Sequence, residues 1–257
     1  MLSSPTNSPE SSVPSASGRM ASFDVIRGFS VVSMVLFHLC YDLRFVYGRG
    51  LTWFAPPLQD IWRASISWTF LFVAGCMCSF SRNGLKRSLR YLTAALAVWV
   101  VTSLAAVDTP INFGIIFCMG ASTLLENLLD RCGVRVAGWR AATVLFSLFL
   151  LLRGVPHGYV GLAGLRIELP RFLYASPLLS PLGLPGPGFA SGDYYPLIPY
   201  TLMYLTGTAV GRKWRDTGYP EVLRSLECPP LAWVGRKALP IYLLHQPLII
   251  AVLELLP

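Results

Sequence analysis

The chain has 257 residues, of which 54% are hydrophobic and only 13% are charged, and its mean hydropathy is +0.55. About a quarter of the residues of a soluble domain are charged, so this composition excludes an ordinary water-soluble protein and indicates a membrane protein. The formal net charge of +8 does not indicate nucleic-acid binding, because no soluble basic segment interleaved with aromatic residues is present.

Residues 1–22 are rich in Ser and Pro and contain no apolar run, which predicts a disordered tail without a signal peptide, an organelle presequence being the alternative. For residues 23–257 we expect one all-α domain, a polytopic membrane bundle of about seven transmembrane helices. An eighth would arise if part of 155–192, a Gly- and Pro-rich loop, re-enters the membrane. The seven apolar stretches lie at 24–46, 61–80, 91–107, 111–129, 141–153, 193–211 and 238–256.

Basic residues predict how this bundle is oriented, because Lys and Arg accumulate in cytoplasmic connections. Fifteen of the 21 fall on one side of the expected bundle, in the amino end and in the connections 82–90, 131–140 and 212–237, and six fall on the other. The sequence therefore predicts a cytoplasmic N-terminus, with the loop at 154–192 on the opposite face.

The first apolar stretch carries four ionisable residues, Asp24, Arg27, His38 and Asp42. At about 100° per residue they share an arc of about 60° on one helix face. Charged groups inside a membrane cost roughly 2.5–3.5 kcal/mol each on insertion scales, so we expect this face to line a polar crevice. His38 lies about 16 Å deeper along the helix than Arg27.

This spacing suggests roles for the four groups. Asp42 is four residues after His38, where it would accept a hydrogen bond from the imidazole and make it a better general base. Arg27 near the cytoplasmic entrance suits a phosphate-bearing ligand, with Asp24 beside it. In the alternative interpretation, Arg27 extends to the membrane surface and His38 and Asp42 form a structural pair. The grouping of all four on one face favours the functional interpretation.

Motifs along most of the chain resemble the heparan-alpha-glucosaminide N-acetyltransferase catalytic-domain family, in its bacterial-type branch. Arg27, ten intervening residues and His38 also match a pattern of the broader transmembrane acyltransferases. The resemblance implies a membrane-bound acyltransferase that uses acetyl-CoA. It is carried, in chain order, by Phe23-Asp-Val-Ile-Arg-Gly28, Met34 to Leu43, Phe70-Leu-Phe-Val-Ala-Gly75, Asn112-Phe-Gly-Ile-Ile116, Ser191 to Pro199 and Trp233 to Pro247.

Two departures from the family pattern concern histidines. The family often has a His where this chain has Phe117, and the segment 44–60 lacks the loop histidine of another branch. Among the later residues, Asp193 and Tyr194, with Tyr195, lie where the outer loop enters the sixth stretch; they would bind an acceptor's hydroxyls, or Asp193 would cap that helix. His245 in the last stretch is a candidate substrate-binding residue or a simple helix-to-helix contact, and no chemical role is expected for His157.

The predicted function is transfer of an acyl group, most plausibly acetyl, from cytoplasmic acyl-CoA to a hydroxyl or amine of a sugar or glycan across the membrane. His38 would act as general base or as acyl carrier. A proton-coupled transporter and a catalytically inactive membrane relative are the alternatives, although no inverted repeat is evident. No metal is implied, since Cys76-Met-Cys78 lacks the spacing of a zinc pair. The oligomeric state stays open.

Overall fold

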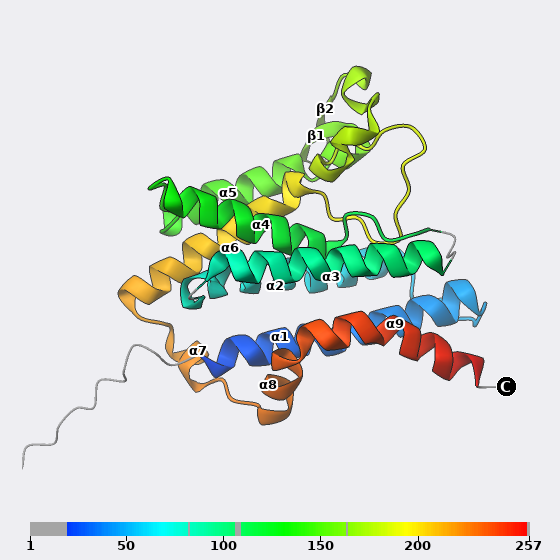
Figure 1. Cartoon of the computed structure of the whole chain (residues 1–257), viewed down its shortest axis with the longest axis horizontal. Coiled ribbons are helices and arrows are strands. Elements are labelled where there is room, and N and C mark those ends of the chain that lie inside the picture. The colour runs from blue at the N-terminus through cyan, green and yellow to red at the C-terminus, as the bar shows by residue number, and fades with distance from the viewer. Residues whose placement is uncertain (1–19, 82, 106–108, 163, 256–257) are drawn as a thin grey trace, which may run out of the picture.

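The computed structural model of the protein describes residues 20–81, 83–105, 109–162 and 164–255. Long helices dominate it and run roughly side by side (Figure 1). Seven of them correspond to the seven apolar stretches of the sequence. They are α1 (Ala21–Tyr41), α2 (Leu58–Cys76), α3 (Gly84–Leu104), α4 (Ile115–Arg131), α5 (Trp139–Leu152), α6 (Leu197–Thr217) and α9 (Ala238–Glu254).

Shorter elements extend or connect these helices. A π-helical turn over Asp42–Val46 continues α1, and a 3-10 turn over Met77–Phe80 continues α2. Two short helices, α7 (Glu221–Ser225) and α8 (Pro229–Arg236), precede α9. Most of the expected tail lies outside the described residues, and α1 begins at Ala21, two residues before the expected boundary.

The segment expected as a loop over the outer end of the bundle is more ordered than the sequence indicates. Strands β1 (Tyr159–Leu162) and β2 (Leu165–Glu168) form an antiparallel hairpin in which Tyr159 pairs with Glu168 and Leu162 with Leu165. Three 3-10 turns accompany it, over Val155–His157, Arg171–Tyr174 and Pro177–Leu182. The described part of 155–192 therefore forms a small cap, and it contains no re-entrant helix.

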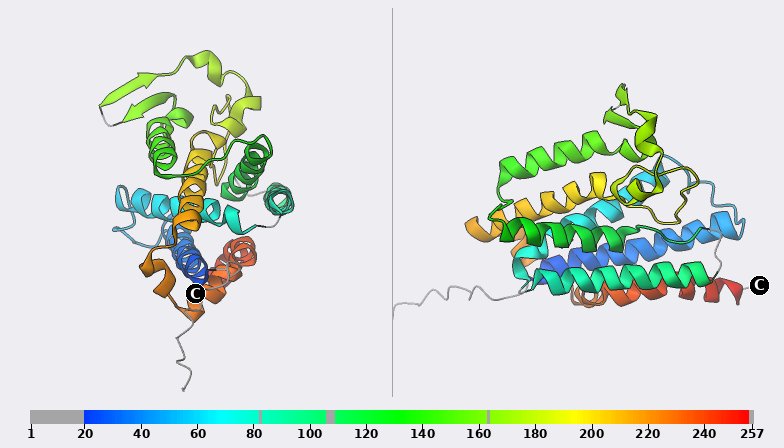
Figure 2. Two further views of the ribbon diagram at one scale, coloured as in Figure 1. Left: turned by 90° about the vertical axis from the view of Figure 1, so that its left-hand side faces the viewer. Right: turned by 45° about the horizontal axis from the view of Figure 1, so that its top comes forward.

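Helix α6 lies at the centre of the bundle when viewed end-on, with α2, α4 and α5 against it (Figure 2). Its buried residues include Gly207 and Gly211, which allow close backbone contact. A Cβ added at Gly207 would lie 2.0 Å from the Phe72 carbonyl oxygen of α2, and one added at Gly75 would lie 2.0 Å from that of Tyr204. Small residues at helix crossings are how membrane helices maximise van der Waals contact.

A second close crossing joins α1 to α8 through a reciprocal pair of glycines. A Cβ at Gly28 would lie 1.9 Å from the Leu231 carbonyl oxygen, and one at Gly235 would lie 1.9 Å from that of Asp24. Helix α9 then turns by 83° from α8 and runs along α1 (Figure 1). The polar face of α1 is thereby covered by the C-terminal part of the chain.

Fewer helices than seven have the length and hydropathy of a membrane span. Among the described residues three do, Ala21–Val46, Leu58–Phe80 and Trp139–His157, and the bent pair α8–α9 would make a fourth. Helices α3, α4 and α6 carry charged residues near one end and small or polar residues along their length, which lowers their mean hydropathy. The apolar helices fit a membrane protein, and the number of seven crossings stays a prediction.

Candidate active site

Two histidines from opposite ends of the sequence meet where α9 covers α1. The rings of His38 and His245 have their centroids 4.8 Å apart at an angle of 61°. His245 is buried, and its Nδ1 lies 2.6 Å from the Tyr242 carbonyl oxygen, so Nδ1 carries the proton and Nε2 is left as an acceptor. The polar face of α1 thus lies against a second imidazole, which α9 supplies.

Asp42 does not accept a hydrogen bond from His38, contrary to our expectation. Both of its carboxylate oxygens accept from Nε2 of Gln246, at 3.0 and 2.8 Å. The two residues do share a face of the first helix, but consecutive residues of α9 lie against them. His38 therefore contacts His245, and Asp42, one turn further on, contacts Gln246.

Two consecutive residues of α9 each carry a buried acceptor atom that is unpaired. Within the described chain, neither Nε2 of His245 nor Oε1 of Gln246 has a hydrogen-bond partner. A buried polar atom without a partner costs about 1–3 kcal/mol, so each such atom requires an explanation. Unpaired acceptors on His245, which lies against His38, and on Gln246 fit a ligand that donates hydrogen bonds through hydroxyl or amine groups.

Asp193 ties the outer loop to the same region, but it caps a different helix from the one expected. Its Oδ2 accepts from the backbone nitrogen of Ile115 at 3.0 Å, at the first turn of α4, and from the Tyr242 hydroxyl at 3.2 Å. The sixth helix begins later, at Leu197. The Tyr242 ring lies 5.7 Å from that of His245, so Asp193 is two side chains away from the histidine pair.

The remaining predicted residues make contacts within the protein. The Tyr194 hydroxyl donates to the Ser180 carbonyl oxygen at 2.6 Å and holds the outer cap. Arg27 pairs with Asp24 at 2.5 Å and donates through Nε to the Gly235 carbonyl oxygen at 2.6 Å. The hydrogen bond from Arg27 to Gly235 joins α1 to α8. A role of Arg27 in binding phosphates stays a prediction.

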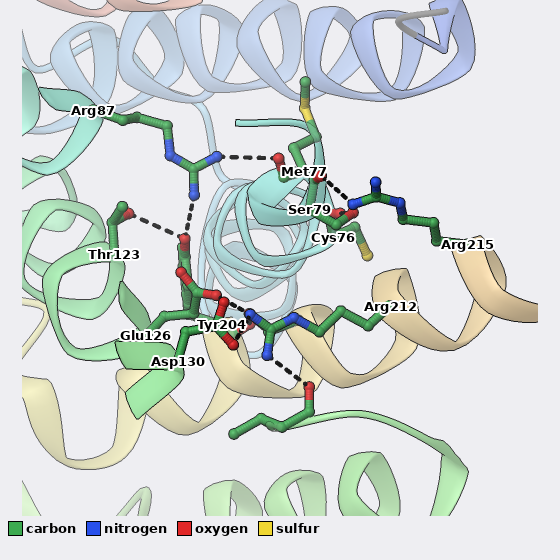
Figure 3. A network of polar contacts seen from close by, with 12 residues as sticks. Cys76, Met77, Ser79, Arg87, Thr123, Glu126, Asp130, Tyr204, Arg212 and Arg215 are labelled. Carbon is green, nitrogen blue, oxygen red and sulfur yellow. Dashed lines mark hydrogen bonds and ion pairs between the residues drawn. The ribbon is translucent and has the colours of Figure 1, made fainter. Parts of the chain in front are cut away.

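Sequence reasoning missed a polar network at the opposite end of the bundle, around the last turn of α2 (Figure 3). Arg87 donates to the Tyr204 hydroxyl at 2.6 Å and to the Met77 carbonyl oxygen at 3.2 Å, and Arg215 donates to that of Ser79 at 2.7 Å. The sequence predicts for these arginines a role in orientation and in attracting the coenzyme A nucleotide, and it does not predict these contacts within the protein.

A buried ion pair belongs to the same network. Arg212 lies 2.5 Å from Glu126 and 2.9 Å from Asp130, and both Arg212 and Glu126 are buried. The available signal was Glu126, an acidic residue within an apolar stretch, because such a residue needs a cationic partner. The network brings the three basic connections to one end of the bundle (Figures 1 and 3).

Among the described residues no three His, Cys, Asp or Glu side chains are grouped as metal ligands. The histidine pair is accompanied by an amide and a carboxylate that bond to each other. Imidazole, amide and carboxylate groups can take part in acid–base chemistry and in hydrogen bonding to a substrate.

Comparison with protein families identifies the chain. Residues 19–247 match the model of the family "Heparan-alpha-glucosaminide N-acetyltransferase, catalytic". The chain belongs to this family. Comparison with curated proteins and with solved structures gave no match. The family match confirms the resemblance seen in the sequence motifs, and it spans both histidines, Asp42 and Gln246.

Membership indicates a membrane acetyltransferase of the kind that acts on heparan-type glucosamine. Phe117 occupies the place at which the family resemblance led us to expect a histidine. Its ring lies 5.1 Å from that of Phe113, in the wall of a cavity between α3, α4 and α9. The described structure thus places no imidazole there, and the histidine pair is formed by α1 and α9.

Proposed function

We propose that this protein transfers an acetyl group from acetyl-CoA to a hydroxyl or amine of a sugar or glycan. The observation that carries the proposal is the unpaired, buried acceptor His245 Nε2 on the ring next to His38, together with the unpaired Gln246 Oε1 on the following residue. A sugar has several hydroxyls, so neighbouring hydroxyls of the acceptor can donate to these atoms while the attacking hydroxyl or amine gives its proton to His38. Family membership supplies the reaction class.

The proposed step is attack of the acceptor on the thioester carbonyl. His38 takes the proton of the acceptor as the new C–O or C–N bond forms, the C–S bond breaks, and the thiolate of CoA leaves and is protonated. His245 and Gln246 hold the acceptor, and Asp42 fixes the Gln246 amide so that its oxygen points away from the carboxylate. In the alternative scheme, His38 itself carries the acetyl group between donor and acceptor.

The proposed direction is from a cytoplasmic donor to an acceptor on the other side, with the N-terminus in the cytoplasm. It rests on the asymmetric distribution of basic residues, and the presence of Arg87 and Arg215 at one end of the bundle supports it. A polyanionic CoA thioester is attracted to such a basic end. The acceptor then reaches the histidines from the end that carries the hairpin.

The test measures acetyl transfer by purified protein in lipid nanodiscs, with acetyl-CoA and glucosamine-type acceptors. Release of the CoA thiol and the mass of the product report the reaction. We expect His38→Ala to lower turnover by about 10²–10⁴-fold, the usual loss for a general base. The matched control is His157→Ala, because His157 is exposed in the outer cap. Wild-type turnover per folded molecule in His38→Ala would refute the mechanism.

A further inference from the structure

A cavity of about 490 Å³ lies between α3, α4 and α9, within the size range of pockets that hold a small ligand. These helices lie on one side of the bundle (Figure 1). Its walls are mainly aliphatic and aromatic, including Leu92, Ala95, Val98, Ile116 and Phe117.

The few polar groups in the wall are largely committed to protein partners. The Asn112 amide lies 3.4 Å from the carbonyl oxygens of Pro110 and Ala190, and the Tyr242 hydroxyl donates to Asp193. An ordered water or a sugar needs several hydrogen-bond partners, which these walls do not offer. The chemistry of the cavity therefore fits a hydrocarbon chain.

The rim on α3 is open to the outside of the bundle. Leu96 and Trp99 line the cavity and are also 58% and 46% exposed. On a membrane helix, exposed apolar side chains face lipid, so a chain can enter sideways from the bilayer.

One wall of the cavity lies close to the histidine pair. Tyr242 forms part of its wall, lies 5.7 Å from His245 ring to ring, and His245 lies 4.8 Å from His38. The cavity adjoins the first turn of α4, whereas the basic network contacts Glu126, about 16 Å further along that helix. The chain site is thus on the side away from the proposed donor entrance.

We propose that this cavity binds the hydrocarbon chain of the acyl acceptor, so that the acceptor is a membrane amphiphile such as a lipid-linked sugar. The inference rests on the proposed function. Its head group, bearing the hydroxyl or amine, lies at His245 and Gln246 while its chain fills the cavity. A soluble sugar would leave the cavity unused.

The test is photolabelling in nanodiscs with a dodecyl glucosaminide that carries a diazirine at the end of its chain. We expect saturable labelling of the segments 92–99 and 111–117, suppressed by excess unlabelled dodecyl glucosaminide and not by glucosamine. Ala95→Phe, which fills the cavity, should reduce labelling at least fivefold. The matched control, Ala97→Phe, lies on the same helix outside the cavity and should label like wild type.

A second variant and two further probes complete the test. Phe117→His replaces Ala95→Phe in the test if the latter does not fold. It keeps a ring of similar size but places polar nitrogens in the wall, so it should also weaken labelling. The same diazirine chain is also supplied as acyl-CoA and as phosphatidylcholine. Labelling by the acyl-CoA probe alone would assign the cavity to the donor, and uncompeted labelling by phosphatidylcholine would assign it to bulk lipid; either result overturns the proposal.

Photolabelling does not depend on catalysis, so the two proposals fail separately. Competed labelling without acetyl transfer to any acceptor would sustain the chain site and refute the proposed function. Transfer to methyl glucosaminide with no labelling of these segments would sustain the proposed function and refute the chain site.

Discussion

At the scale of single residues, His38 and Asp42 each contact a different side chain of α9. His38 lies against His245, and Asp42 bonds to Gln246 rather than to the imidazole. The carboxylate therefore holds the Gln246 amide, and Asp42 and His38 form no hydrogen-bonded pair in the described structure. We therefore expect Asp42 to affect the position of Gln246 and not the basicity of His38.

Replacing the Gln246 amide tests this assignment. Gln246→Met has a similar shape but cannot donate to Asp42 or accept from a substrate. Because one hydrogen bond contributes about 0.5–1.5 kcal/mol, we expect the KM for the acceptor to rise about 2- to 10-fold while that for acetyl-CoA is unchanged. Steady-state kinetics with each substrate varied in turn measures both values.

The control for that variant is Gln59→Met on α2, a helix that contributes no residue to the histidine pair. It should leave both constants at their wild-type values. An equal rise of both KM values in Gln246→Met would instead indicate a general disturbance of the site.

At the scale of helices, close backbone contact positions the C-terminal segment on α1. Gly28 and Gly235 let α8 approach α1 so closely that neither position has room for a methyl group. Arg27 adds a hydrogen bond to the Gly235 carbonyl oxygen at the same crossing. Because α9 follows α8 directly, this crossing also sets where His245 lies relative to His38.

Gly235→Ala should therefore affect both stability and activity. Overfilling a packed contact costs typically 1–3 kcal/mol, and we expect a lower Tm together with reduced acetyl transfer per folded molecule. The control is Gly50→Ala, since nothing lies within 4 Å of a Cβ at Gly50. A Tm for Gly235→Ala equal to that of the control would contradict the close crossing.

The ion pair between α4 and α6 offers a second test at this scale. Arg212 and Glu126 are buried, whereas Arg135 and Asp216 form an exposed pair with side-chain exposures of 62% and 47%. Removing one partner of a buried pair costs up to about 3–5 kcal/mol, and here half-exposed Asp130, 2.9 Å from Arg212, still compensates part of the charge. An exposed pair contributes about 0–1 kcal/mol. Thermal unfolding should show a clear loss for Glu126→Gln and little change for Asp216→Asn.

At the scale of the whole molecule, the basic connections lie at one end and the hairpin cap at the other (Figure 2). Under the proposed function, the donor enters at the basic end and the acceptor at the other, and both reach the histidine pair on α1 and α9.

Sidedness can be measured with a native cysteine. Cys132 is exposed in the connection between α4 and α5, so an impermeant maleimide should label it only after right-side-out vesicles are opened. A cysteine introduced by Glu168→Cys, in a Cys132→Ser background, should react in sealed vesicles because Glu168 is exposed in the hairpin. The opposite pattern would overturn both the orientation and the proposed donor entrance.

The sequence by itself determined the places of the seven long helices and the shared face of Asp24, Arg27, His38 and Asp42. Hydropathy and helical periodicity are properties of a short stretch of chain, so they can be read without knowing what packs against it. The family followed from the sequence for a similar reason, because its motifs are local strings, and the match over 19–247 confirmed it.

Only the tertiary structure decided which groups meet. Asp42 and Gln246 are 204 residues apart in the chain, and Asp193 caps α4 from 78 residues away. Such pairings depend on how helices cross, which here depends on glycines whose role cannot be read from hydropathy. The cavity beside Phe117 and the network around Arg212 arise in the same way, from side chains of separate helices that packing brings together.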